Sequence, residues 1–423
     1  MRKRTTVAGV LSLVGAAGPS VLVASCSEEF VWPVGSEECV AEPQQGAWDP
    51  NLLNWIDVGA PGADVPKQEP WHDIQPHHAF LVAVHAAHLP SGELILYHGE
   101  GETRVWPIGT PPEQMRWHPV PFDVPQANPD LCSYQPVDPS YRCFADIFCS
   151  GQVVLPDGRL FVAGGNVEGN AGGGGLSDMF LFDPADADQD VFPFGWARSN
   201  DTMEVDRWYP TLTVIPGATP QVSPFGRVLI VSGATRTLGG ASTPIFELYD
   251  ADPEVDQVTT LTIQGESPFN SANPMPLYPF MFLLPNGDIF FAGGEDATEN
   301  TRRGRVLIPD YNNGGTWAWH PRIFESSITG GSAVMYAPGK IMKSGGLAPG
   351  DDQLAHQITE TIDLSNTTSG NYTNAPDFVV TAPMARARHF HTLTLLPDGR
   401  VVATGGNSRG NGRVGDHTSY DCD

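Results

Sequence analysis

The amino-acid sequence predicts an all-β fold, a β-propeller of seven-bladed plan whose last blade is incomplete. Three observations carry this prediction. One hairpin phrase recurs six times along the 423 residues, helical periodicity is nearly absent, and the chain contains 46 glycines and 39 prolines. The lack of helical periodicity excludes an α-solenoid, and an array of sandwiches would not repeat a single hairpin phrase so often.

The repeated phrase is an apolar run, then Leu-Pro-x-Gly or a close variant, then a second apolar run. Proline presets φ, and the Asp-Gly or Asn-Gly step supplies the positive φ of a tight turn, so each copy predicts a β-hairpin. A spacing of roughly 50 to 70 residues is typical of a blade of four short strands. The turn glycines are Gly92, Gly158, Gly226, Gly287, Gly339 and Gly399. Four copies end in a glycine pair, which is the kelch pattern and predicts a kelch-type propeller: Gly164-Gly165, Gly293-Gly294, Gly345-Gly346 and Gly405-Gly406.

The first residues have the plan of a secretory signal peptide. Three basic residues at 2–4 precede an apolar stretch over 7–24, and small residues lead to Cys26. Val-Ala-Ser before Cys26 resembles a bacterial lipobox, so we expect a lipidated Cys26 in the bacterial cell envelope; ordinary cleavage nearby and extracellular release is the alternative. The expected segments are a signal peptide with lipobox at 1–26, a tether and N-terminal extension at 27–65, and the propeller at 66–423.

The charge balance limits the class of partner. The chain has 23 Lys and Arg against 49 Asp and Glu, a formal net charge of −26. Such a balance argues against nucleic acid and anionic lipid headgroups as main partners, and it suits a neutral or cationic small ligand. Outside the leader no run approaches the ~20 apolar residues of a membrane span, so we expect membrane contact only through the lipid anchor. We expect a monomer.

Chemistry-bearing residues precede three of the hairpins. Cys149 lies before the second, Tyr209 before the third, and His389 and His391 before the sixth. Inner strands of a propeller begin around its axis, where function gathers in loops, so these side chains are expected to meet around one point. Imidazole together with phenolate suits copper.

The segments around Cys149 and Tyr209 resemble a known family, the galactose oxidase/glyoxal oxidase family of copper-radical oxidases. Phe-Cys-Ser-Gly at 148–151 with the hairpin at 155–166 is similar to the family's radical-cysteine blade. Arg-Trp-Tyr-Pro-Thr at 207–211 with the hairpin at 226–233 is similar to its radical-tyrosine blade. The resemblance covers roughly residues 70–410.

The resemblance implies a cofactor and a reaction. Cys149 and Tyr209 would be joined by a thioether, Tyr209 would bind copper and hold a radical, and His391 would be a copper ligand. The expected substrates are primary alcohols, aldehydes or carbohydrates, oxidised with O2 to give H2O2. The protein would position two one-electron acceptors beside one carbon.

The sequence departs from the family before its last hairpin. Phe390 stands where the family has a tyrosine that serves as axial ligand and base, and a phenyl ring can neither bind copper nor accept a proton. His389 is the candidate substitute, because alternation on an extended strand would place it with His391 as a two-histidine clip. The alternative is a surface histidine beside Arg388.

A second departure concerns the C-terminal side. The family continues with an immunoglobulin-like domain that carries the second histidine ligand, and we expect this domain to be absent.

Two further residues have open interpretations. Tyr278 precedes the fourth hairpin, where with Phe390 it would line the substrate side of the channel or pack as an ordinary strand residue. Trp208 is expected to pack between blades rather than on the Tyr209 ring.

Six cysteines remain to be assigned. If Cys26 carries lipid and Cys149 is in the thioether, the remaining four allow two disulfides: Cys39, Cys132, Cys143 and Cys422. We expect Cys132–Cys143 and Cys39–Cys422, while the other two connectivities stay open.

Two functions are consistent with these residues. The first is an exported copper-radical oxidase homologue. The second is a non-catalytic surface propeller that binds glycan or protein, in which Phe390 is tolerated because no chemistry takes place. Retention of both Cys149 and Tyr209 favours a metal site, and the two departures from the family favour an inactive one.

Overall fold

The structure is a computed structural model. It describes residues 11–15, 18–22, 85–97, 103–110, 116–118, 120–122, 143–167, 175–187, 195–216, 225–236, 240–264, 267–269, 274–294, 302–310, 316–348 and 351–408. The described residues contain strands and turns and no α-helix. No helix among them is long and apolar enough to cross a membrane.

Three consecutive sheets have four antiparallel strands each, and in each sheet the strands follow chain order. The first contains β3 (His85–His88), β4 (Glu93–Tyr97), β5 (Thr103–Pro107) and β6 (Arg116–Trp117). The second contains β9 (Gly151–Val154), β10 (Leu160–Ala163), β11 (Met179–Phe182) and β12 (Trp196–Arg198). The third contains β13 (Thr211–Ile215), β14 (Arg227–Val231), β15 (Glu247–Asp250) and β16 (Gln257–Thr260).

Two more sheets and a hairpin follow. The fourth sheet contains β18 (Met281–Leu283), β19 (Ile289–Phe291), β20 (Arg305–Ile308), β21 (Thr316–Trp319) and, parallel to β21 at the edge, β17 (Thr262–Gln264). The fifth contains β22 (Ser332–Ala337), β23 (Lys340–Ser344), β26 (Thr359–Asp363) and β27 (Val379–Val380). The last hairpin pairs β28 (His389–Leu395) with β29 (Val401–Asn407). Short pairs complete the set: β1 (Leu11–Gly15) with β2 (Gly18–Leu22), β7 (Pro121–Phe122) with β8 (Cys143–Phe144), and β24 (Leu347–Ala348) with β25 (Asp351–Ala355).

The repeated phrase forms the predicted turn. In the second sheet the N–H of Leu155 donates to the carbonyl of Arg159 at 2.8 Å, and the N–H of Gly158 donates to Leu155 at 3.0 Å. Three other copies, beginning at Leu89, Leu284 and Leu396, show the same two bonds. Gly158 has φ of +96°, a conformation that glycine adopts without steric cost. The local turn chemistry therefore sets the register of each inner hairpin.

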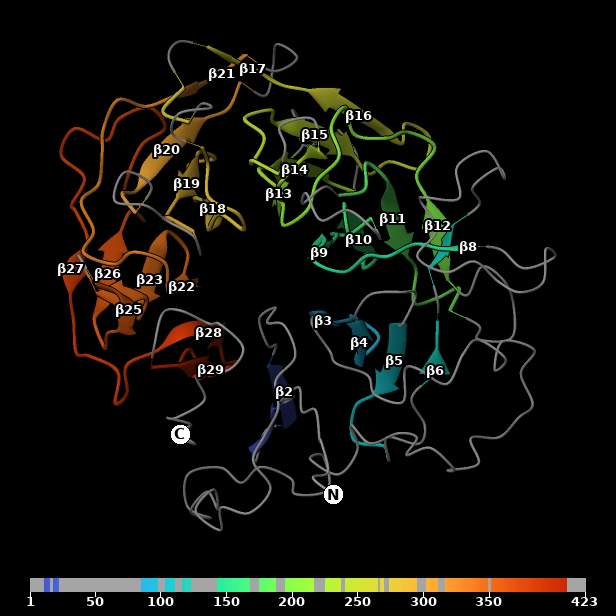
Figure 1. Cartoon of the computed structure of the whole chain (residues 1–423), viewed down its shortest axis with the longest axis horizontal. Helices are drawn as coiled ribbons and strands as arrows, with labels where there is room; N and C mark the ends of the chain where they lie inside the picture. The colour runs from blue at the N-terminus through green and yellow to red at the C-terminus, as the bar shows by residue number, and fades with distance from the viewer. Residues whose placement is uncertain are drawn as a thin grey trace.

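The sheets are arranged around a centre like blades. Figure 1 shows β3, β9, β13, β18, β22 and β28, the first strand of each unit, facing the middle of the molecule. The buried apolar clusters each combine residues of two neighbouring sheets: for example Phe161 with Tyr249, and Phe290 with Ile362. The core thus lies between blades, where each fully buried large apolar side chain contributes about 1.5–3 kcal/mol.

The predicted all-β propeller arrangement is confirmed, with five blades in the described part of the chain. The last hairpin has two paired strands there. Seven blades and the kelch type stay predictions, as do the segment boundaries at 26 and 65. In the predicted signal segment the structure pairs β1 with β2, and Cys26 lies outside the described residues.

Candidate copper centre

Four non-glycine residues at the start of inner strands share an unusual backbone conformation. Cys149, Tyr209, Tyr278 and Phe390 have φ of 57°, 65°, 43° and 55°, and each stands the same number of residues before the proline that ends its inner strand. Non-glycine residues in this region cost on the order of 1–3 kcal/mol each, and they cluster at functional sites. In the fifth blade the position is Gly331, with φ of 79°.

Backbone hydrogen bonds join this position from blade to blade. The N–H of Tyr209 donates to the carbonyl of Cys149 at 2.9 Å, and the N–H of Tyr278 donates to the carbonyl of Tyr209 at 3.1 Å. The inner strands β9, β13 and β18 are neighbours in the same order. The structure therefore brings Cys149, Tyr209 and Tyr278 together, as the sequence predicted for the first two.

Cys149 is in no disulfide among the described residues, and it has no solvent exposure. The turn that carries it is held by Asp146, whose carboxylate accepts the N–H of Phe148 at 3.0 Å and the side-chain amide of Asn166 at 2.9 Å. The N–H of Ser150 closes the turn on the carbonyl of Ile147 at 3.2 Å. A buried thiol in a fixed turn suits a single intramolecular partner better than reaction with solvent species.

The expectation for Trp208 is wrong. Its ring stacks on that of Tyr209, with centroids 4.1 Å apart and planes at 18°. The prediction assumed the alternation of an extended strand, but the positive φ of Tyr209 interrupts that alternation. Tyr278 contacts the same ring at 4.7 Å and 38°. Tyr209 thus has two aromatic neighbours.

Arg207 anchors this segment in the third blade. Its guanidinium is fully buried, donates to the Glu247 carboxylate through Nε at 3.1 Å, and also bonds the carbonyls of Ser232 and Ile245. Burial lowers the pKa of Arg207, while the charge of Glu247 opposes this. The Arg207 carbonyl accepts the N–H of Gly165 in the second blade at 3.1 Å. Removing one partner of such a pair leaves a buried charge uncompensated.

The two histidines of the last hairpin are buried. His389 is 3% exposed and His391 4%, so the alternative of a surface histidine beside Arg388 is wrong. The Nε2 atom of His391 lies 3.0 Å from the Ser344 hydroxyl of the fifth blade. Nδ1 of His391 and both ring nitrogens of His389 have no hydrogen-bond partner among the described residues. A buried imidazole nitrogen without a partner has a free lone pair or N–H to offer a ligand.

Burial keeps these imidazoles neutral at pH 7. It lowers the pKa of His389 to about 4, with a smaller contribution from the nearby His356. It lowers the pKa of His391 to about 3, assisted by Arg388 and His389. Neutral imidazole is the form that binds metals.

The glycine pairs make space for His391. A Cβ on Gly345 would lie 2.5 Å from Cε1 of His391, and a Cβ on Gly406 would lie 2.8 Å from its Cβ. Sequence reasoning missed this role of the glycine pairs.

His356 is another residue that sequence reasoning missed. Both ring nitrogens of His356 lack partners in the part of the chain that is described, and its carbonyl accepts the N–H of Arg388 at 3.3 Å. A histidine in a loop gives no spacing signal that could have revealed it.

A buried lysine, Lys343, lies next to this histidine site. The Nζ of Lys343 donates to the Arg302 carbonyl at 3.1 Å and to the Ser326 hydroxyl at 3.0 Å, and Ser326 donates to Glu360 at 2.8 Å. Burial lowers the pKa of Lys343 to about 7, opposed by the charge of Glu360. Lys343 precedes Ser344 on β23 and so fixes the strand that contacts His391.

The donor types present fit copper. Tyr209 offers a phenol and the last hairpin offers neutral imidazoles with unpartnered nitrogens. No group of three or more His, Cys, Asp or Glu side chains among the described residues is arranged to hold a metal ion. The contacts define two groups at the starts of inner strands: one contains Cys149, Tyr209 and Tyr278, and the other contains His389 and His391.

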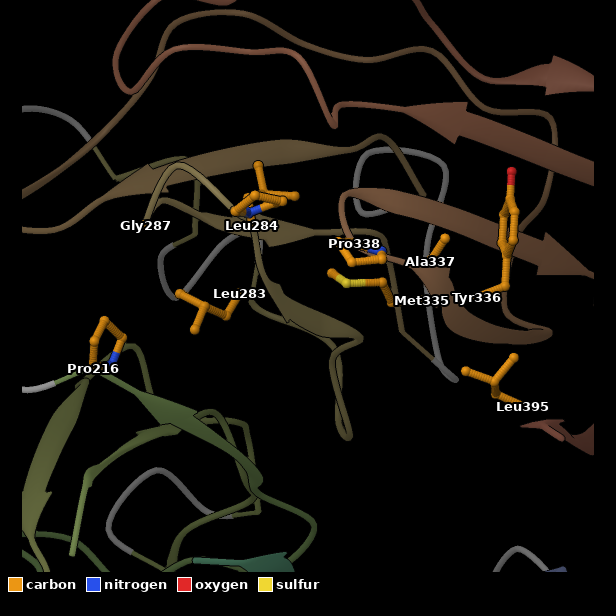
Figure 2. A pocket seen from close by; sticks show the side chains of 10 residues that line it. Pro216, Leu283, Leu284, Gly287, Met335, Tyr336, Ala337, Pro338 and Leu395 are labelled. Atoms are coloured by element: carbon orange, nitrogen blue, oxygen red, sulfur yellow. The ribbon is translucent and has the colours of Figure 1, made fainter. Parts of the chain in front are cut away.

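The cavity in Figure 2 is at the opposite ends of the inner strands. It has a volume of about 590 Å³ and is lined by turn residues of four successive hairpins, from Pro216 through Leu284 and Pro338 to Leu395. Its lining is apolar apart from backbone groups and the hydroxyl of Tyr336. This cavity is therefore separate from the candidate copper centre.

Most of the cysteine predictions fall outside the described residues. Cys26, Cys39, Cys132 and Cys422 lie there, and the side chain of Cys143 in β8 is not described either. Lipidation of Cys26 and the two disulfides therefore stay predictions.

Comparison with known proteins supports the family resemblance noted in the sequence. No family model matches the chain. Over 203 residues it is 28% identical to "Aldehyde oxidase GLOX" of Vitis pseudoreticulata, a match that covers 46% of this chain and 31% of that protein. The chain resembles the galactose oxidase/glyoxal oxidase-like family. The resemblance noted in the sequence is thereby confirmed.

Two further proteins match part of the chain or its fold. Over 151 residues it is 29% identical to a "WSC domain-containing protein" of Arthroderma benhamiae, covering 35% of this chain and 14% of that one. A fungal alcohol oxidase of the AA5 family, solved in complex with copper, is 17% identical with a TM-score of 0.48, over 77% of this chain and 58% of that one. The matches to the curated relatives span less than a third of their lengths.

Proposed function

We propose that the chain is an exported copper-radical oxidase homologue of the galactose/glyoxal oxidase type. It would oxidise primary alcohols, aldehydes or sugars with O2 and release H2O2. The observation that carries the proposal is the pair of Cys149 and Tyr209. A buried thiol in no described disulfide and a tyrosine occupy equivalent strained positions in adjacent blades, and a 2.9 Å backbone hydrogen bond joins them.

The proposed roles follow from these positions. Cys149 would form a thioether to the Tyr209 ring, and Tyr209, His391 and His389 would hold copper. Bound copper would supply one-electron redox chemistry beside the modified tyrosine. The Ser344 hydroxyl orients the His391 ring, and burial keeps both imidazoles unprotonated. Trp208 and Tyr278 pack against the Tyr209 ring, which stays partly exposed, and would limit its orientation.

The remaining assignments belong to the same proposal. The protein would act on small molecules and not on nucleic acid, as a monomer, outside the cell or held at the membrane by a lipid on Cys26. The matched relatives lend no support to the lipid anchor, which rests on the sequence alone. Disulfides Cys132–Cys143 and Cys39–Cys422 would suit an exported chain.

One observation favours the second candidate, a non-catalytic propeller that binds glycan or protein. Phe390 occupies in the last hairpin the same strained position that Tyr209 occupies in the third blade, so a phenol is missing where the family has one. General-base help of that kind is worth typically 10²–10⁴-fold in rate.

Peptide mapping tests the proposal. Mature protein loaded with copper in air, then reduced, is expected to lose the mass of about two hydrogens, because one S–H and one ring C–H are replaced by an S–C bond. Peptides 146–152 and 206–212 should stay joined after reduction. The matched variants C149S and Y209F should show neither change. A Cys149 that stays free in copper-loaded protein would overturn the oxidase function and leave the binding propeller.

A further inference from the structure

Tyr278 contacts Tyr209 and the residue after Cys149 from a third blade. Its hydroxyl donates to the carbonyl of Ser150, the residue after Cys149, at 3.1 Å. Its ring lies 4.7 Å from the Tyr209 ring. Its N–H donates to the Tyr209 carbonyl at 3.1 Å. One residue therefore touches the turn that carries the thiol and the ring that would receive it.

The contact at the Ser150 carbonyl restrains the neighbouring Cys149. Ser150 is buried, and its hydroxyl lies 3.3 Å from the hydroxyl of Tyr97 in the first blade. Tyr97 and Tyr278 thus hold Ser150 from two sides, one through the side chain and the other through the backbone. Movement of Ser150 would move the adjacent Cys149, because the two share a peptide bond.

The backbone of Tyr278 shows that its placement is imposed by its surroundings. A tyrosine rarely adopts a φ of 43°, and it persists there only where neighbouring contacts determine it. The side chain is half-buried and spans from β18 to the start of β9. Other inner strands have the same backbone conformation at this position, so the hydroxyl bond to another blade is what separates Tyr278 from ordinary strand packing.

We propose that Tyr278 is a positioning residue for the cross-link between Cys149 and Tyr209; this rests on the proposed function. In that step the S–H of Cys149 and a ring C–H of Tyr209 are lost, and an S–C bond forms. The two protons and two electrons released pass to dioxygen, which is reduced to hydrogen peroxide in the presence of copper. Tyr278 forms and breaks no covalent bond. It restricts the motion of the thiol relative to the ring, which is the geometry on which such a step depends.

The first test is the rate of cross-linking. Y278F removes only the hydroxyl, so copper affinity is expected to stay within twofold of wild type while the joined peptides form roughly tenfold more slowly. The matched control is Y372F, which removes a buried tyrosine hydroxyl bonded to Asp288 at 2.7 Å, far from the pair. It should cross-link at the wild-type rate. Equal rates in Y278F and wild type would contradict the proposal.

The second test needs no copper. Cys149 has no solvent exposure, so iodoacetamide should alkylate it slowly in the native protein. Loss of the Tyr278–Ser150 bond should raise that rate several-fold in Y278F and leave it unchanged in Y372F. If wild type fails to cross-link, the oxidase function and the cross-linking role of Tyr278 fall together, and a raised alkylation rate then shows only that Tyr278 restrains the Cys149 turn. If the rate does not rise, the positioning role falls.

Discussion

The third blade and the last hairpin present the same backbone position with different chemistry. Tyr209 and Phe390 have φ of 65° and 55° and precede equivalent strands, yet one carries a phenol and the other a bare ring. Two aromatic rings contact Tyr209, and the nearby Arg207 forms a fully buried ion pair with Glu247. Phe390 stands between two buried histidines whose ring nitrogens are largely unpartnered. The same backbone conformation thus carries different side chains in different blades, because the fold requires the turn and not the side chain.

The largest expected effect concerns the anchor of the third blade. R207M leaves the carboxylate of Glu247 buried without its partner, so the free energy of unfolding should fall by about 3–5 kcal/mol. Urea denaturation followed by tryptophan fluorescence measures this. The control is R303M, which removes a partly exposed ion pair with Glu325 and should cost at most about 1 kcal/mol. Similar losses in the two variants would show that the third blade is not specially anchored.

The second prediction restores the missing phenol. F390Y gives the last hairpin the side chain of Tyr209 in the same backbone conformation, so the fold should tolerate it. Under the proposed function it should raise peroxide production on an aldehyde and sugar panel by at least about 100-fold. F225Y, which adds a phenol at a hairpin turn, is the control and should change nothing. An F390Y protein that cross-links but shows no gain would rule out the base role at this position.

The third prediction is a pH dependence of stability in the blade beside the last hairpin. The pKa of Lys343 falls from an ordinary 10.5 to about 7 on folding. Between these values the unfolded chain holds the proton that the folded chain has lost, so stability should rise with pH from 7 to about 10, by up to about 1.4 kcal/mol per unit.

Denaturation at pH 7 to 9.5 measures that slope. K343M should reduce it, because the titrating group is gone, whereas K340M, which alters an exposed lysine paired with Asp363, should leave it unchanged. A slope that is equal in wild type and K343M would show that Lys343 does not lose its proton on folding.

The sequence by itself determined the blade unit and the main candidates. The Leu-Pro-x-Gly turn is local chemistry, visible without any tertiary contact, and its recurrence predicted the hairpins that the structure shows. Cys149 and Tyr209 could be named because each lies where the inner strand of a hairpin begins. The resemblance to copper-radical oxidases rested on the same two segments.

Only the tertiary structure decided how these residues meet. The stacking of Trp208 on Tyr209 and the bond from Tyr278 to Ser150 depend on a positive φ that strand alternation does not anticipate. The burial of His389 and the nearness of His356 depend on two blades packing together. Contacts between blades join residues far apart in the chain, and a repeat pattern contains no information about which side chains face each other across the gap.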